Sequence, residues 1–177
     1  MGQAAFEYTG YYTVAEWEHW QDQWELINGL PYCMSPAPNL RHQRISKYIL
    51  RELDKQIETC GKCEAFLPID WQISEDTVVQ PDISVVCREV SGIRLLAAPT
   101  AIFEILSPST QKKDRTTKFE LYENQGVTYY IIVDPEAESM EVFRLNNAGK
   151  YELLPCESTV EFDFEGCKVI LDLGLIW

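Results

Sequence analysis

The order of hydrophobic periods along residues 39–134 constrains the fold of this chain more than any other feature. Between Asn39 and Cys60, apolar residues recur at every fourth position, which predicts one long amphipathic helix that ends near Gly61. Three apolar, strand-like runs follow, and then a second helix and a further strand, at residues 64–73, 77–87, 100–107, 110–124 and 127–133. This order predicts a mixed β-sheet with helices on its faces.

Further signals flank this core on both sides. Residues 13–23 predict a short helix with a capping box of Thr13 and Glu16, and Asn28-Gly29 predicts a type I′ hairpin turn after it. Beyond residue 139, alternating segments predict a β-meander that extends the sheet. The expected fold class is therefore α/β, leaning toward α+β.

Length and composition favour a single domain. With 177 residues, of which 46% are hydrophobic and 24% charged, the chain has the composition of a globular protein and can build one substantial core. We expect one domain over residues 1–177, with a core at about 39–134 and a C-terminal strand extension at about 139–177.

The sequence carries no signal for a membrane or an oxidising compartment. It has no apolar run of about 18 residues and no N-terminal pattern of a secretory signal peptide, so we expect a cytoplasmic protein with no membrane partner. The six cysteines are scattered along a chain that needs no cross-links, and we expect them to be reduced. Cys60 and Cys63 form a C-x-x-C pair, but the sequence offers no second pair to complete a structural zinc site.

The charge balance argues against a generally basic nucleic-acid-binding surface. Lysine and arginine number 15 against 28 acidic residues, a formal net charge of −13. The distribution is uneven, because residues 39–122 hold 12 of the 15 basic residues. Nearly all of the positive charge therefore lies in this central stretch of the chain.

Glu104 interrupts an otherwise apolar strand. Its same-face neighbours, Ile102 and Leu106, are both apolar, so we expect the strand to be covered on both faces and the carboxylate to be buried. A buried, unpaired carboxylate is costly, and a metal ion or a lysine is expected beside it. A purely structural salt bridge or a position at the sheet edge is the alternative.

Asp82 repeats this anomaly in the preceding strand. It follows Pro81, which removes a main-chain donor and marks an edge or a bulge where a side chain can be redirected. Two carboxylates that converge from neighbouring strands repel each other unless a hard cation, Mg²⁺ or Mn²⁺, lies between them. An Asp in a strand-to-loop turn is the alternative.

The second helix supplies a candidate cation. Four of its residues are spaced by four, three and four positions and share one stripe: Gln111, Arg115, Lys118 and Tyr122. A lysine in this stripe can neutralise charge that develops on a phosphate, or can position a water. A lone lysine on a helix is ordinarily a solvated residue, and only the two acids favour the catalytic interpretation of Lys118.

These residues resemble a known family of nucleases. Asp82 after Pro81, with Glu104 on the next strand, resembles the PD-(D/E)XK nuclease superfamily. More closely, the chain is similar to the Uma-type family of bacterial restriction endonucleases. Seven short segments carry this resemblance in order, at residues 12–14, 25–29, 34–36 with 41–42, 79–82, 104–110, 118–122 and 133–135.

The resemblance implies a restriction-endonuclease-like fold and Mg²⁺-dependent (or Mn²⁺-dependent) hydrolysis of phosphodiester bonds. It implies Asp82 and Glu104 as metal ligands, with Glu25, on the first hairpin strand, approaching the metal or its water. The superfamily places a lysine two residues after the second acid, where this chain has Leu106. In the family pattern, Lys118 from the following helix takes that role.

Substrate contacts are expected around these residues. His42 and Arg41 open the first long helix and, with Arg115 and Tyr122, are candidates for binding the substrate. For His42, a local hydrogen bond at the start of the helix is an equal alternative. The expected partner is nucleic acid, with DNA favoured, and by analogy with nucleases that cut both strands we expect a homodimer.

The sequence is compatible with two functions. The first is a Mg²⁺-dependent endonuclease, in which Asp82 and Glu104 hold the metal and Lys118 positions water or stabilises charge. The second is a non-catalytic acidic binding protein on a nuclease fold, which the net charge of −13 favours. The sequence motifs of dinucleotide enzymes, P-loop ATPases, zincins and α/β-hydrolases are absent.

Overall fold

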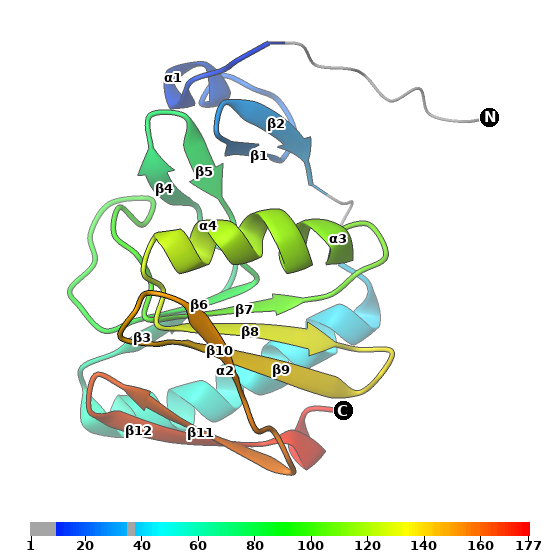
Figure 1. Ribbon diagram of the computed structural model, residues 1–177, viewed down its shortest axis with the longest axis vertical. Helices are drawn as coiled ribbons and strands as arrows, with labels where there is room; N and C mark the ends of the chain where they lie inside the picture. Colours follow the sequence, from blue (N-terminus) through cyan, green and yellow to red (C-terminus); the bar gives the residue numbers. More distant parts are fainter. Residues whose placement is uncertain (1–9, 35–37) are drawn as a thin grey trace.

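A six-stranded mixed sheet forms the centre of the structure, in the strand order β10-β9-β8-β7-β6-β3 (Figure 1). Strands β7 and β8 are parallel, and the other neighbours are antiparallel. The strand bounds are Glu64–Phe66 (β3), Ile83–Val86 (β6), Ala101–Ile105 (β7), Tyr129–Asp134 (β8), Ser139–Leu145 (β9) and Tyr151–Leu154 (β10). This sheet, with a helical segment on each face, confirms the expected α/β class with its α+β character.

The structure is a computed structural model that describes residues 10–34 and 38–177. Ser35 and Pro36, from one of the family segments, lie outside the described residues. None of the helices in these two ranges has the length and hydrophobicity that crossing a bilayer requires.

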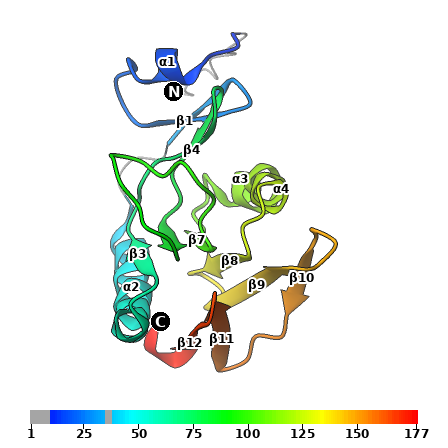
Figure 2. The same ribbon diagram turned by 90° about the vertical axis from the view of Figure 1, so that its left-hand side faces the viewer.

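One long helix, α2 (Leu40–Cys60), covers one face of the central sheet (Figure 2). It begins where the Asn39 side chain accepts a hydrogen bond from the His42 N–H at 2.9 Å. It ends at Gly61, whose φ of 61° is a left-handed conformation that glycine adopts without strain. The stripe buried against the sheet consists of Ile45, Ile49, Leu53 and Ile57, so the predicted helix is confirmed at both ends.

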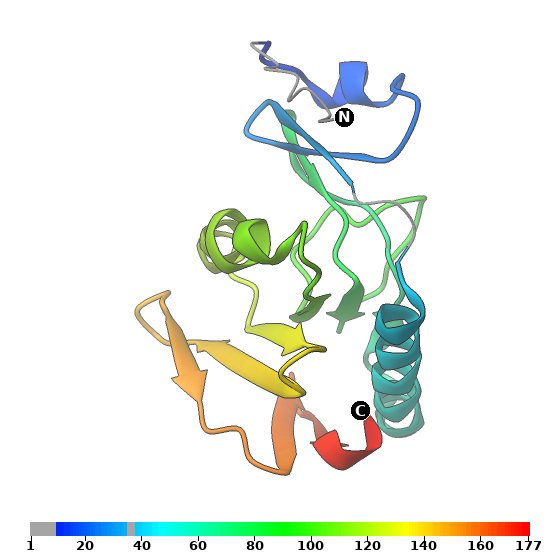
Figure 3. The same ribbon diagram turned by 90° about the vertical axis from the view of Figure 1, so that its right-hand side faces the viewer.

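The second helical segment lies on the opposite face of the sheet (Figure 3). Predicted as one helix, it consists of α3 (Gln111–Lys113), a π-helical turn (Asp114–Lys118) and α4 (Phe119–Asn124). The wider turn buries the side chains of Asp114 and Lys118, and the Tyr130 hydroxyl donates to the Asp114 carbonyl oxygen at 2.9 Å. Turns of this kind occur frequently at functional sites.

A four-stranded antiparallel sheet, in the order β2-β1-β5-β4, forms the upper end of the molecule in Figure 1. Its elements are α1 (Val14–Trp17), β1 (Trp24–Ile27), β2 (Leu30–Cys33), β4 (Trp71–Ser74) and β5 (Thr77–Val79). Asn28 and Gly29 have φ values of 51° and 74°, which confirms the predicted hairpin turn. The capping box of Thr13 and Glu16 is also present, although the helix that it starts has only 4 residues.

The division into two sheets differs from the sequence prediction. The runs 64–73 and 77–87 were each expected to form one strand, but each is split between the central sheet and the four-stranded sheet. Pro68 and Pro81 lie at the two breaks, because proline has no main-chain donor for a strand ladder. The second break leaves Asp82 immediately before β6.

The C-terminal strands follow the expected meander only in part. Strands β9 and β10 extend the central sheet, but β11 (Thr159–Phe164) and β12 (Cys167–Asp172) form a separate hairpin. Alternate residues of this hairpin are buried, and the Gln56 side chain of α2 makes two hydrogen bonds with the main chain of Ile170, at 2.8 and 2.9 Å. The hairpin therefore packs against α2 instead of continuing the sheet.

Two disulfides correct the expectation that the cysteines are reduced. They join Cys60 to Cys167 and Cys63 to Cys87. The free thiols are Cys33 and Cys156. The bonded cysteines are 107 and 24 residues apart in sequence: the packing of the C-terminal hairpin against the end of α2 brings Cys167 to Cys60, and the pairing of β3 with β6 brings Cys63 to Cys87. Spacing along the chain gave no signal of this.

Candidate active site

Asp82 and Glu104 face each other across neighbouring strands. Strands β6 and β7 pair with Ile83 opposite Phe103, so continuing this register by one residue places Asp82 opposite Glu104. The main-chain N–H of Ile105 donates to Asp82 Oδ2 at 2.8 Å. The Glu104 side chain lies on the face that the α3–α4 segment covers, where it contacts Lys118 and Tyr122, and the Asp82 side chain reaches the main chain of β7 and His42 of α2.

The Glu104 carboxylate is buried, with only 4% of the residue exposed. Its Oε1 atom accepts hydrogen bonds from Lys118 Nζ at 2.9 Å and from the Tyr122 hydroxyl at 2.8 Å. Burial raises the pKa of Glu104 to about 8, although the Lys118 charge acts in the opposite direction. The positive group that the sequence led us to expect beside this acid is therefore Lys118.

Lys118 joins buried acids from three elements. Its Nζ atom lies 2.8 Å from Glu25 Oε1, 2.9 Å from Glu104 Oε1 and 3.9 Å from Asp114 Oδ1. Burial alone would lower the pKa of Lys118, but these carboxylates outweigh burial and raise the pKa well above its ordinary value. The side chain is therefore an ammonium ion at neutral pH.

Glu25, on β1, lies in a different environment from that of the metal ligand that the family resemblance implied. Lys118 and the Gln80 main-chain N–H, at 2.8 and 2.9 Å, contact Oε1, and Lys113 bonds to Oε2. Burial raises the pKa of Glu25, but the charges of Lys118 and Lys113 outweigh it and the net shift is downward. With both oxygens engaged, this carboxylate is placed to hold the two lysines.

Asp82 lies nearer to solvent than the other acids. Its side chain is 21% exposed, and Oδ2 lies 3.1 Å from His42 Nε2, whose ring also lies 3.4 Å from the Ser46 hydroxyl through Nδ1. The hydrogen bonds of Asp82 fall on Oδ2, and those of Glu104 fall on Oε1. Among residues 10–34 and 38–177, the second oxygen of each of the two acids has no hydrogen-bond partner and can accept another ligand.

This donor set fits a magnesium or manganese ion held by two acids. Mg²⁺ is commonly bound by one or two carboxylates together with water and substrate phosphate. A three-carboxylate cage is a poorer fit, because in the described ranges no three carboxylate oxygens from different residues lie within 4.8 Å of one another. Asp82 and Glu104 are therefore the two residues suited to the ion.

A cavity of about 420 Å³ opens beside these groups. Its charged and polar lining residues include Glu25, His42, Asp82, Glu104, Lys113, Asp114 and Lys118.

A second hollow of about 610 Å³ shares Gln23, Met34 and Gln80 with this cavity. Its walls include Trp17, Trp20, Trp24 and Arg94. The charged cavity and an aromatic surface are therefore adjacent.

Two of the four predicted substrate contacts belong to the site. His42 lines the cavity beside Asp82. Tyr122 is fully buried beneath Glu104 and donates its hydroxyl hydrogen bond there, so it supports the acid from the protein side.

The two predicted arginine contacts lie elsewhere and are paired with acids. Arg41 is bonded to Glu138 at 2.8 Å, and Arg115 to Glu141 at 2.5 Å. Neither arginine is among the residues that line the cavity.

Two residues of the site, Lys113 and Asp114, were not predicted from the sequence. Asp114 could have been found, because it precedes Lys118 by four residues, the spacing of a helical ion pair. Lys113 carried no such signal, because residues five apart lie on different faces of an α-helix. The π-helical turn, with its wider i→i+5 pattern, brings Lys113 and Lys118 onto the same carboxylate of Glu25.

A mixed sheet that carries paired acids on adjacent strands, with a lysine above them, defines a restriction-endonuclease-like protein. The crystal structure of a putative nuclease belonging to DUF820 from Anabaena variabilis has this fold, with a TM-score of 0.72 over 93% of this chain and 97% of that chain, at 22% identity. Residues 11–167 match the Uma2 family, described as putative restriction endonuclease, and the chain belongs to this family. The uncharacterized protein slr1290 of Synechocystis is 24% identical over 169 residues, which cover 92% of this chain and 87% of the relative. The family resemblance inferred from the seven segments is confirmed.

Proposed function

We propose that this protein is a divalent-metal-dependent endonuclease that hydrolyses the phosphodiester bonds of DNA. The observation that carries the proposal is the pairing of Asp82 with Glu104 across β6 and β7, in one cavity, with one oxygen of each acid outside the hydrogen bonds that the described residues make. A purely structural ion pair would be expected to use the carboxylates more fully, as Glu25 does. Membership of the Uma2 family supports the same conclusion.

Asp82 and Glu104 would hold Mg²⁺ or Mn²⁺. When bound, the ion supplies Lewis-acid polarisation of the scissile phosphate and lowers the pKa of a water. The protein prepares both ligands: the Ile105 N–H orients Asp82, and Lys118 with Tyr122 orients Glu104. The positive charge of Lys118 also favours the ionised form of Glu104, which is the form that binds a cation.

The two lysines have different access to a substrate. The Lys113 side chain is 15% exposed and that of Lys118 is 4% exposed, and both line the cavity. We assign to Lys113 the direct neutralisation of a substrate phosphate. Lys118, which is buried in the wall of the cavity, would stabilise negative charge on that phosphate at longer range and would align Glu104. Glu25 keeps both ammonium groups in position.

The adjoining hollow supports a nucleic acid as the substrate. Nucleobases stack on aromatic side chains, and Trp17, Trp20 and Trp24 with Arg94 offer such surfaces next to the charged cavity. His42 is the candidate for contact with a phosphate beside Asp82. We also propose that the protein is a homodimer, as expected for enzymes that cut both strands. Sedimentation equilibrium would test this oligomeric state.

The proposal is tested by cleavage of supercoiled plasmid, single-stranded DNA and RNA with Mg²⁺ or Mn²⁺. The wild type is compared with Asp82→Asn and Glu104→Gln, and with Glu161→Gln as the control, since Glu161 is exposed on β11. We expect the wild type and the control to cleave DNA, and each site variant to lose at least about 100-fold in rate. Equal cleavage by all four proteins would reject the site.

The competing function, a non-catalytic acidic binding protein, retains the support of the net charge of −13. Thermal melting with added Mg²⁺ distinguishes the two functions further. A metal that binds the native state raises the melting temperature by mass action, and Asp82→Asn should remove that rise. A wild type that shows neither cleavage nor a metal-dependent rise would favour the binding protein.

A further inference from the structure

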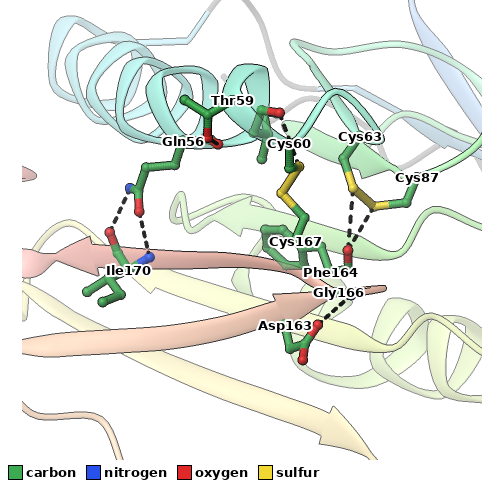
Figure 4. Close-up of a disulfide and its surroundings, with 11 residues drawn as sticks. Gln56, Thr59, Cys60, Cys63, Cys87, Asp163, Phe164, Gly166, Cys167 and Ile170 are labelled. Carbon is green, nitrogen blue, oxygen red and sulfur yellow. Dashed lines mark hydrogen bonds between the residues drawn. A yellow bond between two sulfur atoms is a disulfide. The ribbon is translucent and has the colours of Figure 1, made fainter.

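Four cysteines gather at the end of α2 that lies away from the candidate active site (Figure 4). Cys60 is the last residue of α2, and His42 lies near its start, so the helix separates the two by about 27 Å at 1.5 Å per residue. We propose that Cys60, Cys63, Cys87 and Cys167 form a zinc site when their two disulfides are reduced. This proposal is independent of the endonuclease function.

The sulfur atoms already lie near the spacing that a zinc ion requires. The Sγ atoms of Cys60, Cys63 and Cys167 are all within 4.8 Å of one another, and Cys87 is bonded to Cys63. In a tetrahedral site with Zn–S bonds of about 2.3 Å, the sulfur atoms are about 3.8 Å apart. Within the described ranges, Cys60, Cys63 and Cys167 are the one group of three or more metal-ligating side chains so close together, and Cys87 joins this group through its bond to Cys63. After reduction, the Cys87 side chain would turn toward the other three sulfur atoms to complete the geometry.

The ligand set has the form of a structural zinc site. Cys60 and Cys63 make a C-x-x-C pair across Gly61, whose left-handed φ of 61° turns the chain between them. Cys87 follows β6, and Cys167 begins β12, so distant segments supply the second pair that the sequence analysis lacked. Four thiolates select Zn²⁺ over the Mg²⁺ that carboxylates prefer.

Charge and access also suit a zinc ion. Cys167 is buried, but Cys60, Cys63 and Cys87 are partly exposed, so an ion can enter from solvent. Zinc with four thiolates carries two negative charges. Three basic residues, Lys62, Arg88 and Lys168, and one acidic residue, Glu64, are adjacent in sequence to the cysteines, so positive charge predominates among these neighbours. Nearby positive charge also favours the thiolate over the thiol.

The disulfides and the zinc ion are alternative states of the same four sulfur atoms. A reducing dithiol gives two electrons and two protons to each protein disulfide. The protein disulfide becomes two thiols, and the dithiol is oxidised to a disulfide. Zinc then displaces the four thiol protons. In both states the cross-links hold the β11–β12 hairpin and the end of β6 against α2.

Thiol protection in the wild-type chain tests the proposal. The protein is reduced with dithiothreitol, desalted without oxygen into excess Mg²⁺ to occupy carboxylates, and alkylated with or without added Zn²⁺. We expect alkylation of the partly exposed Cys60, Cys63 and Cys87, together with Cys33 and Cys156, without zinc, and of Cys33 and Cys156 alone with one zinc ion per chain. The proposal is overturned if zinc protects none of the four, or if they remain disulfide-bonded under dithiothreitol.

A matched pair of variants tests the ligands. In reduced protein, Cys87→Ser should weaken zinc binding at least tenfold, whereas Cys33→Ser with Cys156→Ser, which alters the two free thiols, should leave it unchanged. Co²⁺ in place of Zn²⁺ should give the absorption of a tetrahedral thiolate complex in the wild type. Unchanged affinity in Cys87→Ser, or a wild type with no cobalt–thiolate band, overturns the proposal. Should Cys87→Ser fail to fold, the protection and cobalt experiments on the wild type decide.

Discussion

Asp82 accepts its main-chain hydrogen bond, at 2.8 Å, from Ile105, the residue that directly follows Glu104. One acid of the candidate site is therefore fixed by the main chain of the strand that carries the other acid. Because the contact involves the peptide N–H, the relative position of the two carboxylates is set by the pairing of β6 with β7. The flexible side chains of the α3–α4 segment do not determine it.

This contact predicts that two substitutions of Asp82 differ in stability. The Asn side-chain oxygen can still accept the Ile105 hydrogen bond, so Asp82→Asn should change the free energy of unfolding by less than about 0.5 kcal/mol. Asp82→Ala leaves the N–H without a partner and should cost about 1–3 kcal/mol. Urea denaturation without metal measures both. Equal stability of the two variants would contradict the role given to this hydrogen bond.

Among substitutions in the candidate site, we expect replacement of Lys118 to cause the largest loss of stability. Lys118→Met removes the ammonium ion shared by Glu25 and Glu104, which leaves Glu104 without its counter-charge and Glu25 with Lys113 alone, and should cost about 3–5 kcal/mol. The control is Lys112→Met, because Lys112 is exposed on the same helical segment. Combining Lys118→Met with Glu104→Gln should cost less than the sum of the two single changes. Additive losses would mean that the two side chains do not interact.

The local sequence was sufficient to predict the elements whose packing follows one regular period. The helix from Asn39 to Gly61 has a four-residue apolar spacing and both of its caps, and the Asn28-Gly29 turn depends on its own two residues. Glu104 could be identified for a related reason. A charged residue between Ile102 and Leu106 breaks an apolar pattern, and the burial of the strand makes that break costly.

The features that could not be predicted depend on contacts between distant segments. The π-helical turn buries Asp114 and Lys118 over the sheet, and the lysine in turn meets the acids of two strands. Pairing Cys60 with Cys167 requires the β11–β12 hairpin to fold back onto α2. Neither arrangement has a repeating pattern in the sequence that would reveal it.

The raised pKa of Glu104 predicts a pH dependence of stability in metal-free protein. The native state holds this proton up to about pH 8, whereas an unfolded Glu releases it near its ordinary pKa of 4.5. The native state therefore binds more protons in between, and the free energy of unfolding should fall as the pH rises from about 5 to 8, by at most about 1.4 kcal/mol per unit. Glu104→Gln should remove this contribution, and Glu161→Gln should keep it. Parallel pH profiles for the wild type and Glu104→Gln would contradict the assignment.

Tyr122 and Tyr130 offer a matched pair for testing how Glu104 is tuned. The rings lie 5.1 Å apart and both are buried, but the Tyr122 hydroxyl donates to Glu104 Oε1, and the Tyr130 hydroxyl donates to the Asp114 carbonyl oxygen. Each Tyr→Phe change should cost about 1 kcal/mol of stability for one lost hydrogen bond.

A donor to a carboxylate favours its ionised form, so Tyr122→Phe should raise the pKa of Glu104 further and should weaken Mg²⁺ binding near neutral pH. Tyr130→Phe should leave both properties unchanged. Titration of Glu104 by carbon-13 NMR and Mg²⁺ calorimetry measure the two effects, and equal responses in the two variants would show that the Tyr122 hydroxyl does not tune this acid.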